Sequence, residues 1–158
     1  MQTPFWTQVL FDTALESDFL FWAAIRLSRA TLTRAILASP SSVMSEATAA
    51  EKARVREILD HILPVSARRL ELINDAAVTS SLQRYELERI DIPTLAVSAA
   101  DDLFGTYDGA HYTAERVPRA RFIGYSMGGH VLVGHQAELM SEIASFLEQH
   151  PRPAASFP

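Results

Sequence analysis

The sequence predicts an α/β fold in which a helical region precedes a short pair of parallel strands with crossover helices. The first observation is that all six glycines lie between Gly105 and Gly134, so tight turns are confined to the second part of the chain. The second is the order of patterns in that part, which alternates strand, helix, strand, helix. We therefore expect a helical region over residues 4–89, a strand-containing region over residues 90–150 and a disordered tail over residues 151–158.

The helical region is clearest over residues 48–63, TAAEKARVREILDHIL. Thr48 and Glu51 have the spacing of a capping box, in which two side chains satisfy backbone donors at the start of a helix. Four apolar residues fall on one face of this helix: Val55, Ile58, Leu59 and Ile62. Pro64 ends it. Further helices are predicted over residues 12–28, 30–38, 66–73 and 80–89.

The strand-containing region begins with an apolar run over residues 92–99, followed by Asp101 and Asp102, which predicts a buried strand. A helical pattern covers residues 106–116, and residues 121–125 predict a second strand. A last helix is indicated by a stripe of apolar residues: Leu139, Met140, Ile143, Ala144 and Leu147. Strands that alternate with helices pair in parallel, because each crossover helix returns the chain to the same end of the sheet.

Composition excludes several classes of function. Of the 158 residues, 48% are hydrophobic and 21% are charged, which is the balance of a globular protein. The net charge of −5 argues against nucleic-acid binding, which depends on clustered Lys and Arg, and the lack of cysteine excludes thiol chemistry. No signal-peptide pattern opens the chain, and its most apolar run, residues 19–25, is too short to span a bilayer. We expect a cytoplasmic protein that does not bind membranes.

The stretch GYSMGGH, residues 124–130, admits two interpretations. Its first five residues fit G-x-S-x-G, the turn that carries the nucleophile of many serine hydrolases, which would make Ser126 a nucleophile. Alternatively, Gly128 and Gly129 form a tight turn that presents His130 as a base. The second interpretation is favoured, because one turn, one helix and a tail follow Ser126 and leave no further strand to carry an acid.

Acidic residues follow the first predicted strand, and a histidine follows the second. Functional groups in an open parallel sheet gather at the carboxyl ends of its strands, so Asp101 or Asp102 is expected beside His130. A carboxylate in that position fixes the tautomer of the imidazole and stabilises its protonated form. The alternative for the two aspartates is a solvated turn. We predict that one acid and the histidine form a pair of catalytic type.

The segments IDIPTLAVSAADDLFGT and ARFIGYSMGGHVLVGHQAELMSEIASFL resemble the C-terminal part of α/β-hydrolase-fold enzymes. In that family a penultimate strand leads into the catalytic acid, and the last strand leads into a Gly-His turn and a closing helix. By this resemblance Asp102 falls on the acid, with Asp101 as the fallback, and His130 falls on the base. The preceding helices resemble the lid, or cap, that such enzymes insert before the acid strand.

The resemblance implies a serine hydrolase acting on an ester or a related small acyl or carbon–carbon substrate, without a cofactor. The first half of the family fold, with its oxyanion loop and nucleophile elbow, has no counterpart in this sequence. We therefore expect a truncated C-terminal portion that carries acid and base but no nucleophile, and that is inactive alone. Its partner is expected to be an N-terminal hydrolase half, or a second copy bound through the exposed strand edge.

Two other functions remain open from the sequence. One is a non-catalytic remnant or protein-pairing module that lacks the catalytic serine. The other is catalysis by this chain alone through Ser126. A metal site is not expected, because His130 and His135 are too widely spaced to share a helical face and have no third ligand nearby. His61 and His111 fall in predicted helices and are interpreted as surface residues.

Overall fold

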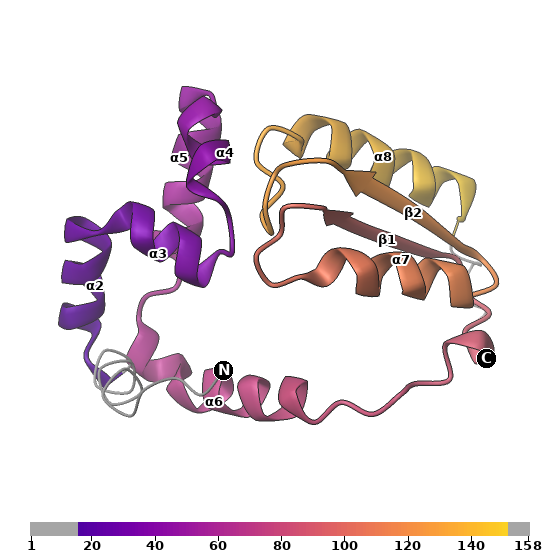
Figure 1. Cartoon of the computed structure of the whole chain (residues 1–158), viewed down its shortest axis with the longest axis horizontal. Coiled ribbons are helices and arrows are strands. Elements are labelled where there is room, and N and C mark those ends of the chain that lie inside the picture. The colour runs from indigo at the N-terminus through magenta and orange to yellow at the C-terminus, as the bar shows by residue number, and fades with distance from the viewer. Residues whose placement is uncertain (1–15, 152–158) are drawn as a thin grey trace, which may run out of the picture. The chain divides into compact units, whose positions relative to one another are not determined.

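The structure, a computed structural model, describes residues 16–151 (Figure 1). These residues divide into two compact units. The first contains the described residues up to Leu37 together with Ala49–Tyr85. The second contains Ala38–Thr48 and the described residues from Glu86 onward. The predicted tail over residues 151–158 lies outside the described residues except for Pro151, and so does the start of the predicted lid.

The first unit is helical. Its helices are α2 (Asp18–Leu27), α3 (Arg29–Ile36), α5 (Ala49–Asp60) and α6 (Val65–Ser80). The core of this unit is built from buried residues of α2 and α6: Phe21, Ile25 and Val65. Four partly buried residues pack against them: Leu32, Ile36, Ile62 and Leu63. As the pattern over residues 48–63 predicts, Val55 and Leu59 are the buried residues of α5.

The carboxylate of Asp18 joins two helices of the first unit. Helix α6 begins after Pro64, which provides no side-chain cap. Asp18 Oδ1 accepts a hydrogen bond from the Ser66 amide at 2.9 Å, and its Oδ2 accepts one from the Ser66 hydroxyl at 2.7 Å. Those bonds satisfy an amide at the start of α6 from the first turn of α2. They also lower the pKa of Asp18, because they favour the charged form.

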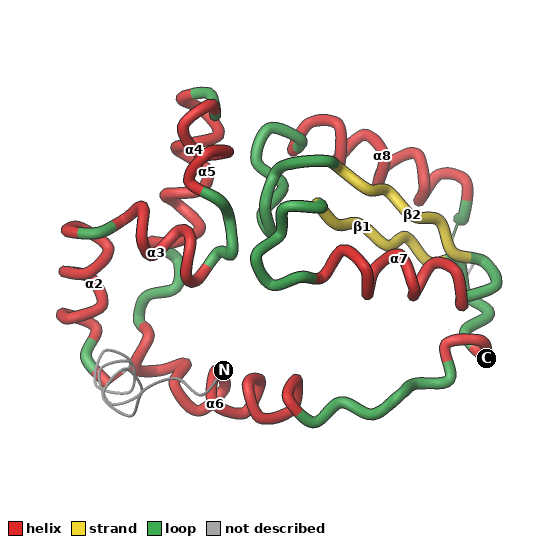
Figure 2. The backbone as a smooth tube through the Cα atoms, in the orientation of Figure 1, coloured by secondary structure: helices red, strands yellow, loops and turns green. Residues whose placement is uncertain are grey.

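The second unit is a mixed α/β structure. In chain order it contains α4 (Ser41–Glu46), the 3₁₀ turn η1 (Leu87–Arg89), β1 (Thr94–Ala99), α7 (Thr106–Arg116), β2 (Ala120–Tyr125) and α8 (Gln136–Gln149) (Figure 2). The two strands pair in parallel, in register from Thr94 opposite Ala120 to Ala99 opposite Tyr125. The predicted parallel strand pair is therefore present, and α7, the crossover helix between its strands, has the predicted bounds. Helix α8 follows β2 and leads to no further strand within residues 16–151.

Helices α7 and α8 cover opposite faces of this sheet. Successive side chains of a strand point to opposite faces. On one face, Phe122 packs edge-on against Tyr107 of α7, with ring centroids 5.3 Å apart. On the other, Arg121 forms an ion pair with Glu142 of α8. Figures 1 and 2 show the same three layers.

Three features differ from the sequence prediction. Helix α6 extends to Ser80, beyond the predicted end, and the α-helix predicted over residues 80–89 is wrong: η1 is the only helical turn described after α6 and before β1. Leu82 and Tyr85 are exposed there, so no packing stabilises a short helix that is marginal on propensity alone. Helix α4 was not predicted, and residues 38–48 group with the second unit rather than with the helical region.

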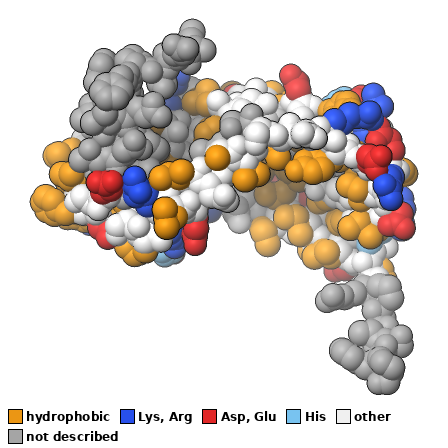
Figure 3. All heavy atoms as spheres, turned by 90° about the horizontal axis from the view of Figure 1, so that it is seen from below, with side chains coloured by type: hydrophobic (Ala, Val, Ile, Leu, Met, Phe, Trp, Pro, Cys, Tyr) orange, Lys and Arg blue, Asp and Glu red, His pale blue; other side chains and the backbone are white. Residues whose placement is uncertain are grey.

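The sheet of the second unit is incompletely covered. Within residues 16–151 it has two strands, and Leu95, Ala96 and Val97 of β1 are only half-buried. Parallel strands are ordinarily buried on both faces and continued by further strands. Hydrophobic side chains are also visible on the molecular surface (Figure 3). None of the described helices is both long enough and apolar enough to cross a membrane.

Candidate functional site

The structure brings Asp102 and His130 together at the carboxyl ends of the two strands. Asp102 follows β1 by three residues, and His130 follows β2 by five. Because β1 and β2 are adjacent and parallel, the loops after them start side by side. The distance from Asp102 Oδ2 to His130 Nδ1 is 2.9 Å, a charge-assisted hydrogen bond.

Two further groups donate to the Asp102 carboxylate, and a third bonds to one of them. Its Oδ1 accepts the Phe104 amide at 2.8 Å, and its Oδ2 accepts the hydroxyl of Thr106 at the start of α7. The hydroxyls of Ser98 and Thr106 are 2.9 Å apart. Since Thr106 gives its single proton to Asp102, Ser98 is the donor in that second bond. The result is a chain of hydrogen bonds from β1 through α7 to the carboxylate.

These bonds keep Asp102 ionised. The Asp102 side chain is only 2% exposed, and this burial alone raises the pKa of a carboxyl group. The hydrogen bonds from Thr106, His130 and Phe104 act in the opposite direction, and together they bring the pKa of Asp102 below its ordinary value. Asp102 is therefore a carboxylate at neutral pH and can only accept hydrogen bonds.

The ionised acid defines the state of His130. Because Asp102 has no proton to give, Nδ1 of His130 carries the hydrogen in their bond, and Nε2 of a neutral imidazole has its lone pair free. The His130 side chain is 44% exposed, so the imidazole is partly open to solvent while its Nδ1 is engaged by Asp102. The ring of Phe104 meets the imidazole edge-on, with centroids 4.9 Å apart. Phe104 is itself 57% exposed and gives the histidine an apolar neighbour.

The loop that carries His130 lies against the segment that precedes α4. The Ala38 carbonyl accepts hydrogen bonds from the amides of Leu103, at 3.0 Å, and His130, at 3.4 Å. One backbone carbonyl thus joins the loop after the acid to the loop of the histidine. Gly129 has a φ of +61° and lies against Ser39, which is buried. Sequence reasoning missed both contacts of residues 38 and 39, because nothing in the local pattern indicates where that segment lies.

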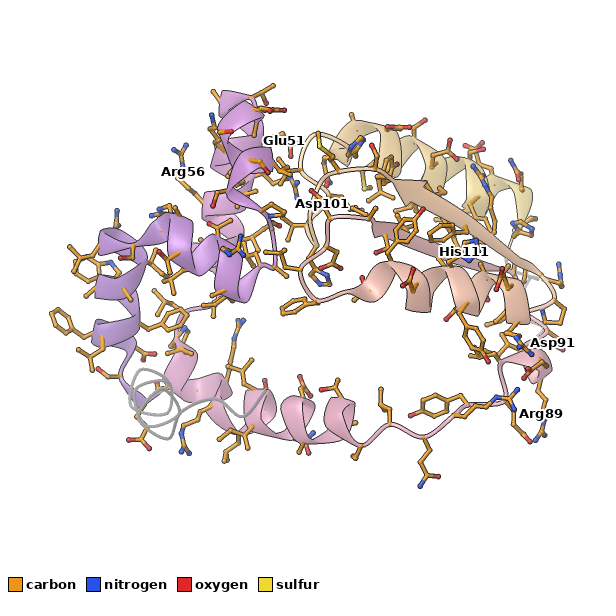
Figure 4. The ribbon with its side chains drawn as sticks, viewed as in Figure 1. Glu51, Arg56, Arg89, Asp91, Asp101 and His111 are labelled. Atoms are coloured by element: carbon orange, nitrogen blue, oxygen red, sulfur yellow. The ribbon has the colours of Figure 1, made fainter. Side chains whose placement is uncertain are left out.

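The two neighbouring aspartates have different hydrogen-bond partners in the structure. The Oδ1 atom of Asp101 accepts the backbone amide of Gly129 at 2.8 Å, whereas the ion pair of His130 is with Asp102. Figure 4 shows Asp101 in the loop after β1, at the end of the sheet opposite Asp91. Asp102 is therefore the acid that pairs with His130. Sequence reasoning also missed Thr106, although its position four residues after Asp102, at the start of a predicted helix, could have indicated it.

Ser126 does not lie in a nucleophile elbow. In such an elbow the serine sits on a sharp turn directly between a strand and a helix. Here β2 ends at Tyr125, residues 126 and 127 form a bend, and the loop continues until α8 begins at Gln136. Ser126 is exposed within the histidine loop.

The other histidines are engaged elsewhere. His135 stacks on Tyr125, with ring centroids 4.1 Å apart, and its Nδ1 is 3.3 Å from Glu138 Oε2. His111 of α7 packs edge-on against Phe122. No cluster of three or more His, Cys, Asp or Glu side chains that could hold a metal ion occurs among residues 16–151.

Comparisons with known proteins identify no relative of this chain. No protein-family model matches the chain, and neither the curated proteins nor the solved structures contain a significant match.

Proposed function

We propose that the chain supplies the acid and the base of a serine hydrolase of the α/β-hydrolase type, with His130 as general base and Asp102 as the residue that orients it. The observation that carries this proposal is the bond of 2.9 Å between Asp102 and His130 at the carboxyl ends of adjacent parallel strands. The substrate class is an ester or a related small acyl or carbon–carbon substrate, an expectation that comes from the family resemblance.

The proposed chemistry is acid–base catalysis around Nε2 of His130. A serine hydroxyl attacks the carbonyl carbon of the substrate while its proton moves to Nε2. The resulting imidazolium is stabilised by the Asp102 carboxylate, which stays ionised because its pKa is lowered. The imidazolium then returns the proton to the leaving group. Hydrolysis of the acyl-serine repeats these steps with water as the nucleophile.

The proposal takes the serine from another polypeptide segment. Ser126, the serine in the G-x-S-x-G pattern, lies in an exposed bend without a helix directly after it. The half-buried residues of β1 support a sheet that continues beyond the two described strands. A further parallel segment beside β1, with its own nucleophile elbow, would cover these residues and place a serine near the carboxyl ends of the strands. An N-terminal half of an α/β-hydrolase would supply both the further strand and the serine nucleophile.

Reconstitution tests the proposal. The 158-residue chain is assayed with p-nitrophenyl esters and a fluorophosphonate probe, first alone and then with the polypeptide encoded immediately upstream. We expect turnover and labelling only in the mixture, with the label on the added polypeptide. His130→Ala should abolish turnover, whereas His111→Ala, a histidine change on α7 of the same unit, should preserve it. Labelling of the chain alone that Ser126→Ala removes would overturn the proposal in favour of catalysis by Ser126.

A protein-pairing module is the second candidate, and the incompletely covered β1 favours it. In that case the strand edge binds a protein while the Asp102–His130 pair only stabilises the two loops. Binding of the added polypeptide without turnover, with an affinity unchanged by His130→Ala, would support this function. The same assay thus separates the two candidates.

A further inference from the structure

Asp101 and Asp102 contact consecutive residues of the histidine loop. Asp101 Oδ1 accepts the amide of Gly129 at 2.8 Å, and Asp102 Oδ2 accepts Nδ1 of His130 at 2.9 Å. Each pair of neighbours is joined by one planar peptide unit, whose Cα atoms are about 3.8 Å apart. Two hydrogen bonds therefore join two consecutive residues of the acid loop to two consecutive residues of the histidine loop.

The bond from Asp101 acts on two consecutive glycines that precede His130. Gly128 has a φ of +136° and Gly129 a φ of +61°, and glycine loses more conformational freedom on folding than any other residue. The bond to the Gly129 amide holds the peptide between Gly128 and Gly129, one residue before the peptide that joins Gly129 to His130. Without it, His130 would keep its side-chain bond to Asp102, the edge contact with Phe104 and the longer bond from its amide to the Ala38 carbonyl, at 3.4 Å. Among the described residues, the Gly128 and Gly129 amides would have no other acceptor from the acid loop, although both glycine carbonyls accept bonds within the histidine loop.

We propose that Asp101 is a positioning residue, which fixes the backbone before His130 so that the imidazole keeps its Nδ1–H bond to Asp102. This inference rests on the proposed function for its catalytic meaning, but its geometry can be tested without activity. Asp101 acts only as a hydrogen-bond acceptor, so the side-chain oxygen of asparagine can replace its Oδ1. Asp102 differs, because its charge stabilises the imidazolium.

Nuclear magnetic resonance of the full chain is the test. The ¹⁵N shifts of the imidazole report whether Nδ1 or Nε2 carries the proton, and amide exchange reports the bond of Gly129. We expect the Nδ1–H tautomer of His130 in the wild type. Asp101→Ala should mix the tautomers and speed exchange of the Gly129 amide by about tenfold or more, the effect of losing a charge-assisted bond. Asp101→Asn should restore the Nδ1–H tautomer of His130 and bring the exchange rate of the Gly129 amide to within about threefold of the wild-type rate.

Two controls keep the result interpretable. Asp91→Ala removes an exposed aspartate of the same unit and should change neither signal. The resonances of His111 on α7 report whether the unit remains folded. If Asp101→Ala unfolds it, Asp101→Ser, whose hydroxyl is one bond shorter than the carboxylate, is the substitute.

The outcomes separate this inference from the proposed function. A wild-type Nδ1–H tautomer that Asp101→Ala or Asp101→Ser leaves unchanged, with unchanged Gly129 exchange, overturns the positioning role and leaves the acid–base pair intact. A wild-type His130 in the Nε2–H tautomer shows that the pair itself is absent, and it overturns both.

Discussion

Gly129 and Ser39 lie so close together that no side chain fits between them. A Cβ atom built on Gly129 would lie 2.5 Å from Ser39 Oγ and 2.7 Å from Ser39 Cα. The hydroxyl could rotate away, but the Cα atom could not move without the backbone. The residue before His130 is therefore restricted to glycine by a neighbouring backbone as well as by its own φ of +61°.

Gly129→Ala should destabilise the second unit by about 3 kcal/mol, from roughly 1–2 kcal/mol for the left-handed conformation and a similar overlap cost against Ser39. Gly105→Ala is the matched control, because Gly105 has a φ of +69° but open space around its Cβ position. The Gly105→Ala variant should be destabilised only by the cost of the left-handed conformation, about 1 kcal/mol. Urea denaturation followed by circular dichroism gives both values. Equal losses in the two variants would mean that the contact with Ser39 is unimportant.

Thr106→Val should cost about 1 kcal/mol, because it removes the hydroxyl that donates to the Asp102 carboxylate and accepts from Ser98. Thr113→Val is the control in the same helix, since that hydroxyl bonds only to the carbonyl of Gly109 one turn earlier. Its loss should be a few tenths of a kcal/mol. The comparison uses the free energy of unfolding at pH 7. A Thr106→Val variant as stable as Thr113→Val would contradict the role of Thr106 in holding the acid.

The lowered pKa of Asp102 predicts how stability depends on pH. In the unfolded chain an aspartate titrates near 3.9, and in the folded protein Asp102 titrates below that value. The folded state therefore binds fewer protons between these pKa values. The stabilisation from Asp102 is fully present above the unfolded pKa, and it is lost as the pH falls through the folded one.

Asp102→Asn should consequently be less stable than the wild type at pH 7, by about 2 kcal/mol for hydrogen bonds to a buried charged group. The difference between the two proteins should shrink as the pH is lowered below about 4. Asp18→Asn is the comparison for acid titration in the first unit, where Ser66 lowers the pKa of Asp18. Denaturation curves from pH 7 to pH 3 measure the differences. A gap between wild type and Asp102→Asn that widens in acid would contradict the assigned ionisation.

The sequence predicted the elements with strong local signals. Helix α7 has the predicted bounds, and both strands lie within a few residues of theirs, because periodicity and glycine turns act locally. The meeting of Asp102 with His130 could also be predicted, since the carboxyl ends of adjacent parallel strands share one edge. The sequence distinguishes Asp102 from Asp101 only by a shift of one residue along the chain. The structure shows that Asp102 is the carboxylate bonded to the ring.

The contacts that could not be predicted join residues far apart in the chain. Ala38 and Ser39 contact the loops of the acid and the histidine, about sixty and ninety residues later. Neither the hydrophobic periodicity nor the spacing of motifs in the sequence encodes such a contact, because it depends on the tertiary path of the chain. The absent helix after Ser80 has the same cause: its exposed Leu82 and Tyr85 find no surface to pack against.

Phe104→Ala should expose His130 to chemical modification. The Phe104 ring meets the imidazole edge-on at 4.9 Å, a type of contact worth about 0.5–1.5 kcal/mol. Diethyl pyrocarbonate acylates accessible neutral imidazoles, so its rate of reaction at His130 should rise by about twofold to tenfold when the ring is removed. Mass spectrometry of digested protein gives the rate at each histidine, with His135, stacked on Tyr125, as the internal reference.

Phe19→Ala is the matched variant for this experiment, because Phe19 is an exposed aromatic residue of α2 that stacks on Trp22 rather than on a histidine. It should leave the rate at His130 unchanged. A rate at His130 that stays at the wild-type value in Phe104→Ala would show that the phenyl ring does not shield the imidazole. A rise at every histidine would instead indicate loosening of the whole unit. A rise confined to His130 is the expected result, because the ring covers one edge of an imidazole that Asp102 still holds through Nδ1.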